Sequence, residues 1–467
     1  MHAAAVIGAL AAAHISGLQQ PIRGSPPRAI SRRPRASVRA SKALPGPFEL
    51  PGLGAPDFLF RYSMGGEPLG SVLLDYREQF GDIFTIKTGP IRQVWVVGEA
   101  MVDEMYSLPA CSGRSQLPAG KTPFGDEFLF LKRDPVAAQP IRKKQQRWLS
   151  ENAGGKDVRA AVASMEPELF AAIEAAMAAG ASGGANGAVW PSGPVGACML
   201  GALLGVFGGT NLDGCLSLAE RSELLSSLAG YRKRANAPPN PFATKLDYAQ
   251  RVRELLLDAL SRTGRSDAEC EEVLPLLVSA CVGGGEIFPL LMQWTVRRLA
   301  LDPAAQAEIR SELESSSKPY GSSLPRMLAA VMRQCPYSLA IGPPRKALAD
   351  FEYRGMTVPE SSLVFAMHPG VPRSGPLPSL SKAARDAHGE SRALRMFGVG
   401  SRGCTAAETS LAFLCCALAA IFRRYEVTVT DAVDEEELLR YRSDGSLLVP
   451  DVDVRLMFTR VGARRAG

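Results

Sequence analysis

One cysteine stands in a setting that suits metal ligation. Cys404 closes a run that begins at Phe397 and holds three glycines, and an apolar stretch to Ala420 follows. Glycine lets the backbone adopt conformations closed to other residues and approach a bound group closely. At the N-terminus of the helix that the apolar stretch predicts, amide N–H groups and the helix dipole stabilise a thiolate. Arg402 adds a fixed cation for a carboxylate. These features predict an axial ligand of haem iron.

The alternative for such a cysteine is an inert, buried thiol in a glycine-rich turn, and we assign that role to Cys415 and Cys416. A zinc site built from these two with Cys404 is disfavoured, because adjacent residues on a helix point about 100° apart and no fourth ligand is evident. The nine cysteines form no CxxC pair, and only four histidines are present. The sequence therefore argues against a disulfide framework and against a histidine-based metal site.

The run from Phe397 to Ala406 resembles the haem-binding loop of the cytochrome P450 family, F-x-x-G-x-R-x-C-x-G. Phe397, Gly400, Arg402 and Cys404 match this pattern, and Ala406 stands where glycine is usual. The resemblance implies that Cys404 ligates the iron of haem b (iron protoporphyrin IX). It also implies that Phe397 packs on the sulfur side and that Arg402 binds a haem propionate.

Segments upstream of the cysteine resemble the same family. Arg333 precedes Cys404 by 71 residues, about the usual gap after the family's E-x-x-R segment. Arg345 follows a Gly-Pro-Pro turn and resembles the strand arginine that binds the second propionate. The basic stretch 142–147, followed by Trp148, resembles the helix whose Trp and Arg contact the propionates. Arg147 is the candidate in that stretch.

A long helical stretch resembles the family's central helix, which crosses the distal face of the haem. Three glycines at 283–285 precede Glu286, and the stretch ends at Asp302-Pro303. The family motif there is [AG]-G-x-[DE]-T-[TS]. Glu286 keeps the acid and is the candidate proton relay, whereas Ile287 replaces the threonine whose hydroxyl helps to deliver protons to bound oxygen. Pro289 removes a helix hydrogen bond and predicts a kink.

Two structural residues of the family pattern are missing. The glutamate of E-x-x-R falls on Ala330, and no P-E-R-F segment is present between Gly370 and Ser391. Arg333 has therefore lost its usual ion-pair partner, and an unpaired buried arginine is costly. We expect either another acceptor for Arg333 or a loose support beneath the cysteine loop.

The resemblance implies a haem-thiolate monooxygenase, an oxidoreductase that inserts one oxygen atom of O2 into an apolar substrate. Its electrons come from a ferredoxin-like or reductase donor. The basic stretch 142–147, with Arg423 and Arg424, is a candidate docking face for an acidic donor. Ile287 supports a second hypothesis, a peroxide isomerase, dehydratase or lyase that needs no donor. Ala330, the absent P-E-R-F and Ile287 support a third, a degenerate haem-binding protein without activity.

The rest of the chain predicts the elements that position these residues. Apolar periodicity indicates mostly helix, and short alternating runs indicate a few small sheets. With the resemblance, this predicts a mainly α cytochrome P450 fold with small β-sheets, as a single domain over residues 44–467. The predicted helices are 156–179, 217–230, 246–263 and 268–317; the strands lie in 81–97, 350–364 and 425–429; the loop is 370–389.

The charge of the chain is concentrated at its start. The sequence has 53 basic and 47 acidic residues, and residues 1–42 hold seven of the basic residues and no acidic one. The remainder is close to neutral, which excludes a basic nucleic-acid-binding body. Hydrophobic residues make up 46% and charged residues 21%, and this composition excludes wholesale disorder.

Residues 1–43 are predicted to be a disordered leader that targets the protein to an organelle, a plastid more than a mitochondrion. A short apolar start is followed by an Arg- and Ser-rich run without acids, which is typical of transit peptides. Its eleven apolar residues are too few for a membrane span, which needs about 20. The apolar run 195–207 is short and contains three glycines, so it predicts a core helix. We expect no transmembrane helix.

Overall fold

A computed structural model describes residues 42–114, 135–152, 155–184, 187–209, 212, 214–236, 248–370, 378–386, 396–430, 435–444 and 447–462. The chain forms two compact units. Among the described residues, 42–114 and 344–366 belong to unit 1, and the others belong to unit 2. The predicted leader lies outside the described residues except for its last two. The predicted single domain stays a prediction, and each unit is described by itself.

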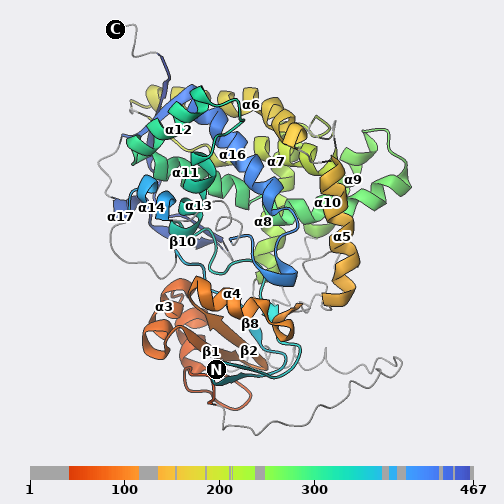
Figure 1. Ribbon diagram of the computed structural model, residues 1–467, viewed down its shortest axis with the longest axis vertical. Helices are drawn as coiled ribbons and strands as arrows, with labels where there is room; N and C mark the ends of the chain where they lie inside the picture. Colours follow the sequence, from red (N-terminus) through yellow and green to blue (C-terminus); the bar gives the residue numbers. More distant parts are fainter. Residues whose placement is uncertain are drawn as a thin grey trace. The chain divides into compact units, whose positions relative to one another are not determined.

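Unit 1 is built on a five-stranded sheet with the strand order β1-β2-β8-β5-β3, of which Figure 1 labels β1, β2 and β8. Strands β1 (Ile83–Thr88) and β2 (Ile91–Val96) pair antiparallel, which confirms the predicted hairpin. Strand β8 (Leu363–Ala366) runs parallel to β2, and β5 (Arg345–Lys346) pairs antiparallel with β8. Strand β3 (Gly113–Arg114) closes the sheet beside β5. Two arginines therefore reach this edge of the sheet.

Short helices and a second hairpin complete unit 1. The hairpin turns at Arg354 and Gly355, and both have positive φ. Helix α3 turns Val72, Leu73 and Tyr76 toward the interior, because residues four apart share one helix face. The elements are α2 (Pro56–Phe58), η1 (Leu59–Met64), α3 (Leu69–Phe80), α4 (Glu99–Ser107), η2 (Pro109–Cys111), β6 (Phe351–Tyr353) and β7 (Met356–Val358).

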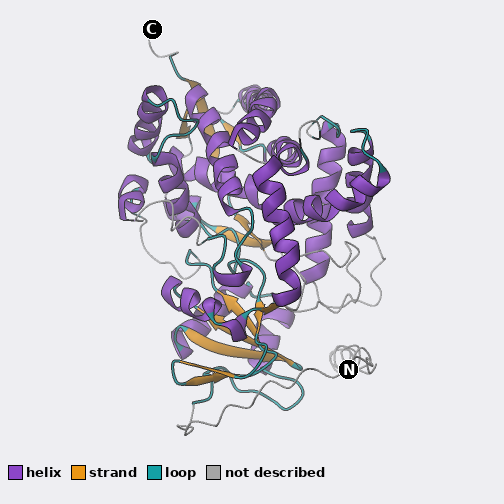
Figure 2. Cartoon of the chain, turned by 45° about the vertical axis from the view of Figure 1, so that its right-hand side comes forward, coloured by secondary structure: helices purple, strands orange, loops and turns teal. Residues whose placement is uncertain are grey.

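Unit 2 is mostly helical (Figure 2). Its centre is α7 (Ser192–Gly208), which is apolar along almost its whole length and buried, as predicted for a core helix. Helices α6, α8 and α10 pack around it. The other helices of the unit are α5 (Pro135–Asn152), α6 (Gly155–Ser182), α8 (Leu218–Asn236), α9 (Tyr248–Ser261), α10 (Asp267–Gly284), α11 (Ile287–Ala300), α12 (Pro303–Ser315), α13 (Ser323–Gln334), α14 (Leu380–Asp386), η4 (Gly400–Arg402), α16 (Ala407–Arg424) and α17 (Glu435–Leu438).

The described residues of unit 2 form two small sheets. Strand β12 (Arg455–Arg460) pairs antiparallel with both β4 (Ala188–Val189) and β9 (Tyr425–Val429). The predicted strand 425–429 is confirmed over its full length. Strands β10 (Tyr441–Asp444) and β11 (Leu447–Pro450) form a separate antiparallel hairpin. The mainly α architecture with small sheets agrees with the prediction.

The predicted long helix 268–317 is divided into three helices. Helix α10 ends at Gly284 and α11 begins at Ile287, so the kink predicted from Pro289 is a break. Pro289 has no N–H and cannot bond to the carbonyl of Gly285. The second division lies at Asp302, whose side chain accepts a hydrogen bond from the Ala305 N–H at 3.0 Å and caps α12.

Among the described residues, the stretch from Asp267 to Ala300 is long and apolar enough to cross a membrane. Half of its most apolar window is buried inside the protein. Helix α10 packs against α7 and α9, and α11 packs against α7 and β9. These contacts explain the apolar composition of the stretch, because a helix in the core of a protein is apolar as well. The expectation of no transmembrane helix is not contradicted.

The predicted loop 370–389 was wrong over part of its length, since it contains α14. Leu380 and Ala384 are buried and lie one turn apart on that helix. The N–H of Leu380 donates to Asp302 Oδ2 at 2.8 Å, so the side chain that caps α12 also binds the start of α14. This tertiary contact overrides the loop composition of the segment.

Candidate functional site

The cysteine loop folds back on itself and presents Cys404 at its end. Gly398 and Gly400 have φ values of 84° and 67°, a region that favours glycine, so both positions require it. The Cys404 N–H donates to the carbonyl of Phe397 at 2.8 Å, and the Gly403 N–H donates to that of Gly400 at 3.1 Å. These bonds fix the backbone just before α16, as the sequence predicted.

The Cys404 thiol is exposed to solvent, yet protein surrounds it closely enough to desolvate it. Burial raises the pKa of the thiol, while the Ala406 N–H and the charge of Arg142 act against this rise. The Ala406 nitrogen lies 3.4 Å from Sγ. The Ala406 N–H and Arg142 therefore lower the pKa of the thiol as predicted, but by less than desolvation raises it. Without a metal the group is a thiol at neutral pH, and metal ligation displaces its proton.

The other predicted residues of the loop take distinct positions. Arg402 is 7% exposed and lies in the short helical turn η4. Phe397 is half-buried, and Gly400 is exposed. A buried guanidinium in this loop suits the predicted carboxylate-binding role of Arg402, which stays a prediction.

Helix α5 lies beside the cysteine loop. The Thr405 hydroxyl donates to Gln145 Oε1 at 3.2 Å, and Gln145 is buried. Arg142, one turn earlier on the same face, is half-buried; burial lowers its pKa, and Cys404 opposes that change. Arg147 is exposed instead, and Trp148 donates through Nε1 to the carbonyl of Phe207 at 2.9 Å. Among these cations, the structure brings Arg142 to the thiol.

The break between α10 and α11 faces the helix that follows the cysteine. Phe288, at the start of α11, contacts Phe413 of α16 with ring centroids 5.5 Å apart. Phe413 lies six residues after Ala407, or about 9 Å along the helix axis. Unit 2 therefore brings the start of α11, two residues after Glu286, beside the half of α16 that follows Cys404.

Glu286 is held by an arginine that the sequence analysis did not single out. Arg232 donates through Nε to Oε2 and through Nη2 to Oε1, both at 2.9 Å. Ile287 begins α11 and has no hydroxyl. The predicted proton-relay carboxylate is thus engaged in an ion pair, and the next residue offers no proton.

In unit 1, Arg345 stands directly opposite Arg114 in the β3–β5 pair. Both are buried, at 1% and 7% exposure, and the Arg345 guanidinium lies 4.5 Å from the centre of the Tyr106 ring. Burial raises the pKa of Tyr106 to about 12 although Arg345 opposes it, so the phenol stays neutral. Like charges on opposed strand positions are unfavourable, and an anion relieves them. Arg114 could not be found from the sequence, because only the strand register places it there.

Ala330 stands at the position of the missing E-x-x-R glutamate, and a different buried arginine, Arg298, forms an ion pair in this part of unit 2. Ala330 is buried, and Arg333 is only partly exposed, so the cost expected for a fully buried arginine does not apply in full. Arg298 of α11 is buried and donates to the carbonyl of Pro378 at 2.8 Å. It also forms an ion pair with Glu435 at 3.2 Å. This cation ties α11 to the segments that begin α14 and α17.

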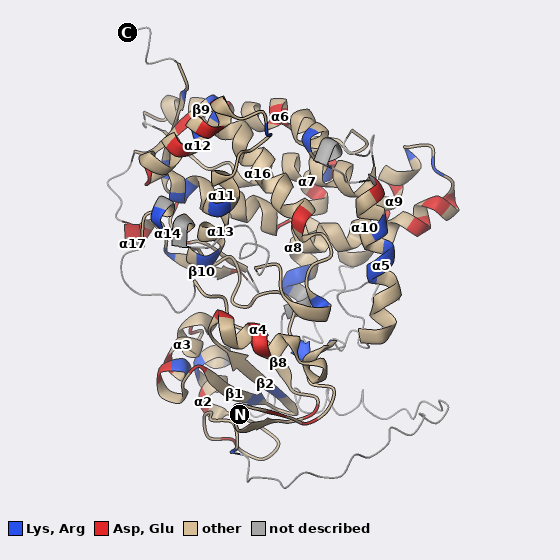
Figure 3. Ribbon diagram, in the orientation of Figure 1, with Lys and Arg blue, Asp and Glu red and all other residues tan. Residues whose placement is uncertain are grey.

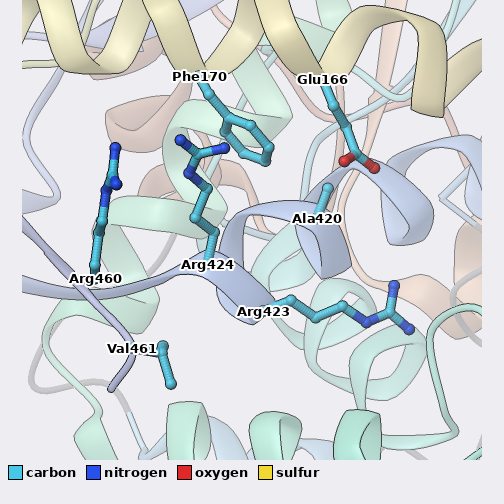
Figure 4. A pocket seen from close by; sticks show the side chains of 7 residues that line it. All are labelled: Glu166, Phe170, Ala420, Arg423, Arg424, Arg460 and Val461. Carbon is cyan, nitrogen blue, oxygen red and sulfur yellow. The ribbon is translucent and has the colours of Figure 1, made fainter. Parts of the chain in front are cut away.

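A hollow of about 550 Å³ opens at the far end of α16 (Figure 4). It is lined by Glu166 and Phe170 of α6, by Arg423 and Arg424 of α16, and by Arg460 of β12. An 18-residue helix is about 27 Å long, so this end of α16 is far from the cysteine loop. The prediction that Arg423 and Arg424 extend the basic face of 142–147 was wrong.

Within the described parts of the chain, no group of three or more His, Cys, Asp or Glu side chains is placed to hold a metal ion. Cys415 and Cys416 are buried in α16, which agrees with their predicted structural role.

No family model matches the sequence, and no curated protein matches it. Among solved structures, the chain is similar to a cyanobacterial protein, CYP120A1, described with retinoic acid bound. The two are 15% identical with a TM-score of 0.66, and the match covers 91% of this chain and 100% of that one. At this identity the likeness concerns the fold.

Proposed function

The chain has the cytochrome P450 fold, and from that premise we propose that it is a haem-thiolate oxidoreductase with Cys404 as the iron ligand. The observation that carries the proposal is the cysteine loop. It presents a solvent-accessible thiol before α16, with the Ala406 N–H 3.4 Å from the sulfur. The leading activity is that of a monooxygenase, which inserts one atom of O2 into an apolar substrate.

The residues present fit haem b. Cys404 supplies one anionic sulfur, and the nearby charge of Arg142 favours its ionised form. In unit 2, Arg402 is a buried cation suited to a propionate. In unit 1, Arg345 stays a propionate candidate by the resemblance, and Arg114 stands opposite it in the same strand pair as a further candidate.

The remaining loop residues support this ligation. Gly400 allows the tight turn before the cysteine, and the carbonyl of Phe397 accepts the Cys404 N–H. The Phe397 ring is the candidate packing surface on the sulfur side. Arg147 stays a predicted propionate partner, although its exposure suits a surface role better.

When bound, haem supplies a redox-active iron to which O2 can bind. The chain's own residues hold and adjust the ligand: Cys404 gives up its thiol proton, and the Ala406 N–H donates to the sulfur. Arg142 offsets the negative charge that results. Hydrogen bonding and charge at the sulfur control how much electron density a thiolate donates to iron.

The electron donor is proposed to be ferredoxin-like or a reductase with an acidic surface. Helix α5 carries the exposed cations Lys143, Lys144 and Arg147 (Figure 3). Gln145, on the opposite face of α5, contacts Thr405, so α5 lies between these cations and the cysteine loop. An acidic partner bound to the cations would be held beside the helix that borders this loop. The similar solved structure binds retinoic acid, which supports only the class of substrate, an apolar molecule.

One observation favours a second candidate, a peroxide isomerase, dehydratase or lyase that needs no electron donor. Oxygen activation requires protons on the distal side, and there Ile287 has no hydroxyl and Glu286 is engaged by Arg232. A reaction that rearranges a substrate peroxide requires neither.

An absorption spectrum of the reduced, carbon-monoxide-bound protein tests the proposal. We expect a thiolate-type band in the wild type and in the control Cys415→Ala, and its loss in Cys404→Ala. Absence of haem uptake by the wild type rejects both enzymatic candidates and leaves a degenerate binding protein. Conversion of a fatty-acid hydroperoxide without reductant supports the second candidate, and turnover that requires a donor and O2 supports the first.

We also propose that residues 1–43 direct the protein to a plastid. The proposal is supported by their composition, which is rich in Arg and Ser and lacks acids. Fusion of residues 1–43 to a fluorescent protein tests it: uptake into plastids is expected, and mitochondrial or diffuse signal contradicts it.

A further inference from the structure

Arg232 joins three elements of unit 2. Its Nε and Nη2 atoms bind both carboxylate oxygens of Glu286, which stands in the helix break. Its Nη1 atom donates to the backbone carbonyl of Asp444, and Nη2 lies 3.3 Å from Asp444 Oδ2. Arg232 belongs to α8, and Asp444 ends β10. One side chain thus connects a helix, the break and the C-terminal hairpin.

The charges around this arginine balance. Lys233 binds Asp444 Oδ1 at 2.9 Å, so two cations face two carboxylates, and we call these four residues the Arg232 cluster. Burial lowers the pKa of Arg232, but Glu286 and Asp444 outweigh it and raise the value overall. Burial raises the pKa of Asp444, but Lys233 and Arg232 outweigh it and lower the value overall. The shifts of both pKa values favour the charged forms of Arg232 and Asp444.

The cluster differs from a surface ion pair in its burial. The side chains of Arg232 and Glu286 are 12% and 20% exposed. A second arginine, Arg251, makes a similar forked pair with Glu223, at 2.7 and 3.0 Å, but both side chains are about half exposed. Exposed pairs contribute little to stability, whereas removal of one partner from a buried pair leaves an uncompensated charge.

We propose that Arg232 is a positioning residue that fixes the Glu286 carboxylate in the helix break and couples it to the β10–β11 hairpin. The fork engages both oxygens of Glu286, so the direction of this carboxylate is set by α8. The hairpin and the break then open together. The structural coupling does not depend on the proposed function. One consequence does depend on it: with haem bound, Glu286 can exchange protons on the distal side only after Arg232 releases it.

Hydrogen exchange measured on the full-length protein tests the coupling. In Arg232→Met we expect faster exchange both in Tyr441–Asp444 and in residues 285–290, by about tenfold, which corresponds to about 1.4 kcal/mol of opening free energy. Arg232→Lys keeps the charge but not the fork, so it should restore part of the protection. Glu286→Gln should speed exchange in the same two segments, because Arg232 connects Glu286 to Asp444 of the hairpin. Arg251→Met is the matched control and should leave both segments unchanged.

Wild-type exchange in the hairpin of a folded Arg232→Met protein would overturn the proposal. So would faster exchange in Arg232→Met that is confined to α8. In the haem-loaded protein, the ferric absorption spectrum should change in Arg232→Met and Glu286→Gln but not in Arg251→Met. The exchange result does not require haem, and the carbon monoxide spectrum does not require the cluster. Failure of this proposal and failure of the proposed function are therefore distinguishable.

Discussion

Arg114 and Arg345 are paired residues on neighbouring strands, and their buried guanidinium groups share one edge of the unit 1 sheet. Like charges on opposed strand positions are unfavourable, and a bound carboxylate would offset them. Each cation also has a favourable contact within unit 1: Arg114 Nη1 donates to the carbonyl of Pro344 at 3.1 Å, and the Arg345 guanidinium lies 4.5 Å from the centre of the Tyr106 ring.

Arg114→Met is expected to weaken haem retention with little effect on the stability of the haem-free protein. In haem-free protein it removes both a like-charge contact and the hydrogen bond from Arg114 to the carbonyl of Pro344, so the free energy of unfolding should change by less than about 0.5 kcal/mol. In haem-loaded protein it removes a carboxylate partner, and haem transfer to an acceptor such as apomyoglobin should be faster. Denaturant titration and the transfer rate measure the two effects. Unchanged haem transfer contradicts the assignment of Arg114.

Arg142→Met is expected to raise the pKa of the Cys404 thiol further above its ordinary value, because it removes the cation that opposes desolvation. At a fixed pH below that pKa, alkylation of Cys404 in haem-free protein should slow by about threefold, the effect of half a pKa unit. Mass spectrometry of the Cys404 peptide measures the rate. Arg147→Met, on an exposed part of α5, is the control and should alkylate like the wild type.

Glu312→Gln is expected to weaken the start of α13. Glu312 accepts hydrogen bonds from the backbone and hydroxyl of Ser322, both at 2.6 Å, and from the Ser323 N–H at 2.7 Å. Burial raises its pKa, but these bonds outweigh it and lower the pKa to about 2. The ionised carboxylate should contribute about 1 kcal/mol, as helix caps do.

The folded pKa of Glu312 is below its unfolded value. Its contribution is therefore fully present above about pH 4.5 and is lost as the pH falls toward about 2. Denaturant titrations at pH 6 and pH 3 should show a larger difference between wild type and Glu312→Gln at pH 6. An equal difference at both values contradicts the assignment.

Arg297→Met is expected to stabilise the protein. The Arg297 side chain is fully buried, and its three nitrogens have no hydrogen-bond partner among the described residues. Burial lowers its pKa to about 10, with weak opposition from Asp453. Because the folded pKa is below the unfolded one, the charge destabilises the fold at all pH values below about 10. Removal should raise the free energy of unfolding by about 1–3 kcal/mol.

Denaturant titration at pH 7 measures this change. The neighbouring Arg298→Met is the contrasting variant, because Arg298 is buried with partners at Pro378 and Glu435 and its loss should destabilise. A loss of stability in Arg297→Met shows that the guanidinium has a partner, such as a buried anion.

Local patterns carried most of what could be predicted from the sequence. The cysteine loop is defined within ten residues by two glycines that need positive φ, and the β1–β2 hairpin by a two-residue turn. Pro289 predicted an interruption of the helix, because it lacks one backbone N–H. Each of these features is set by backbone chemistry between residues close in the chain.

The missed features all depend on distant residues. Arg232 is 54 residues from Glu286 and 212 from Asp444, so the residues near it in the sequence do not predict the cluster. The choice between Arg142 and Arg147 depends on which face of α5 meets the cysteine loop, and charge alone does not determine that face. Helix α14 forms in a loop-like segment because Asp302, far earlier in the chain, binds its first residue.

The break at Gly285 and Glu286 also changes how force passes through the molecule. An unbroken rod over the 34 residues from Asp267 to Ala300 would carry a displacement from one end to the other. The break divides this rod into two parts: α10 packs against α7 and α9, and α11 packs against α7, β9, α12, α13 and α16. Because both parts pack against α7, that helix connects them across the break. Backbone hydrogen bonds from Gly285 to Cys281 and from Leu290 to Glu286 remain on either side of the break, and the Arg232 cluster ties the break to α8 and β10.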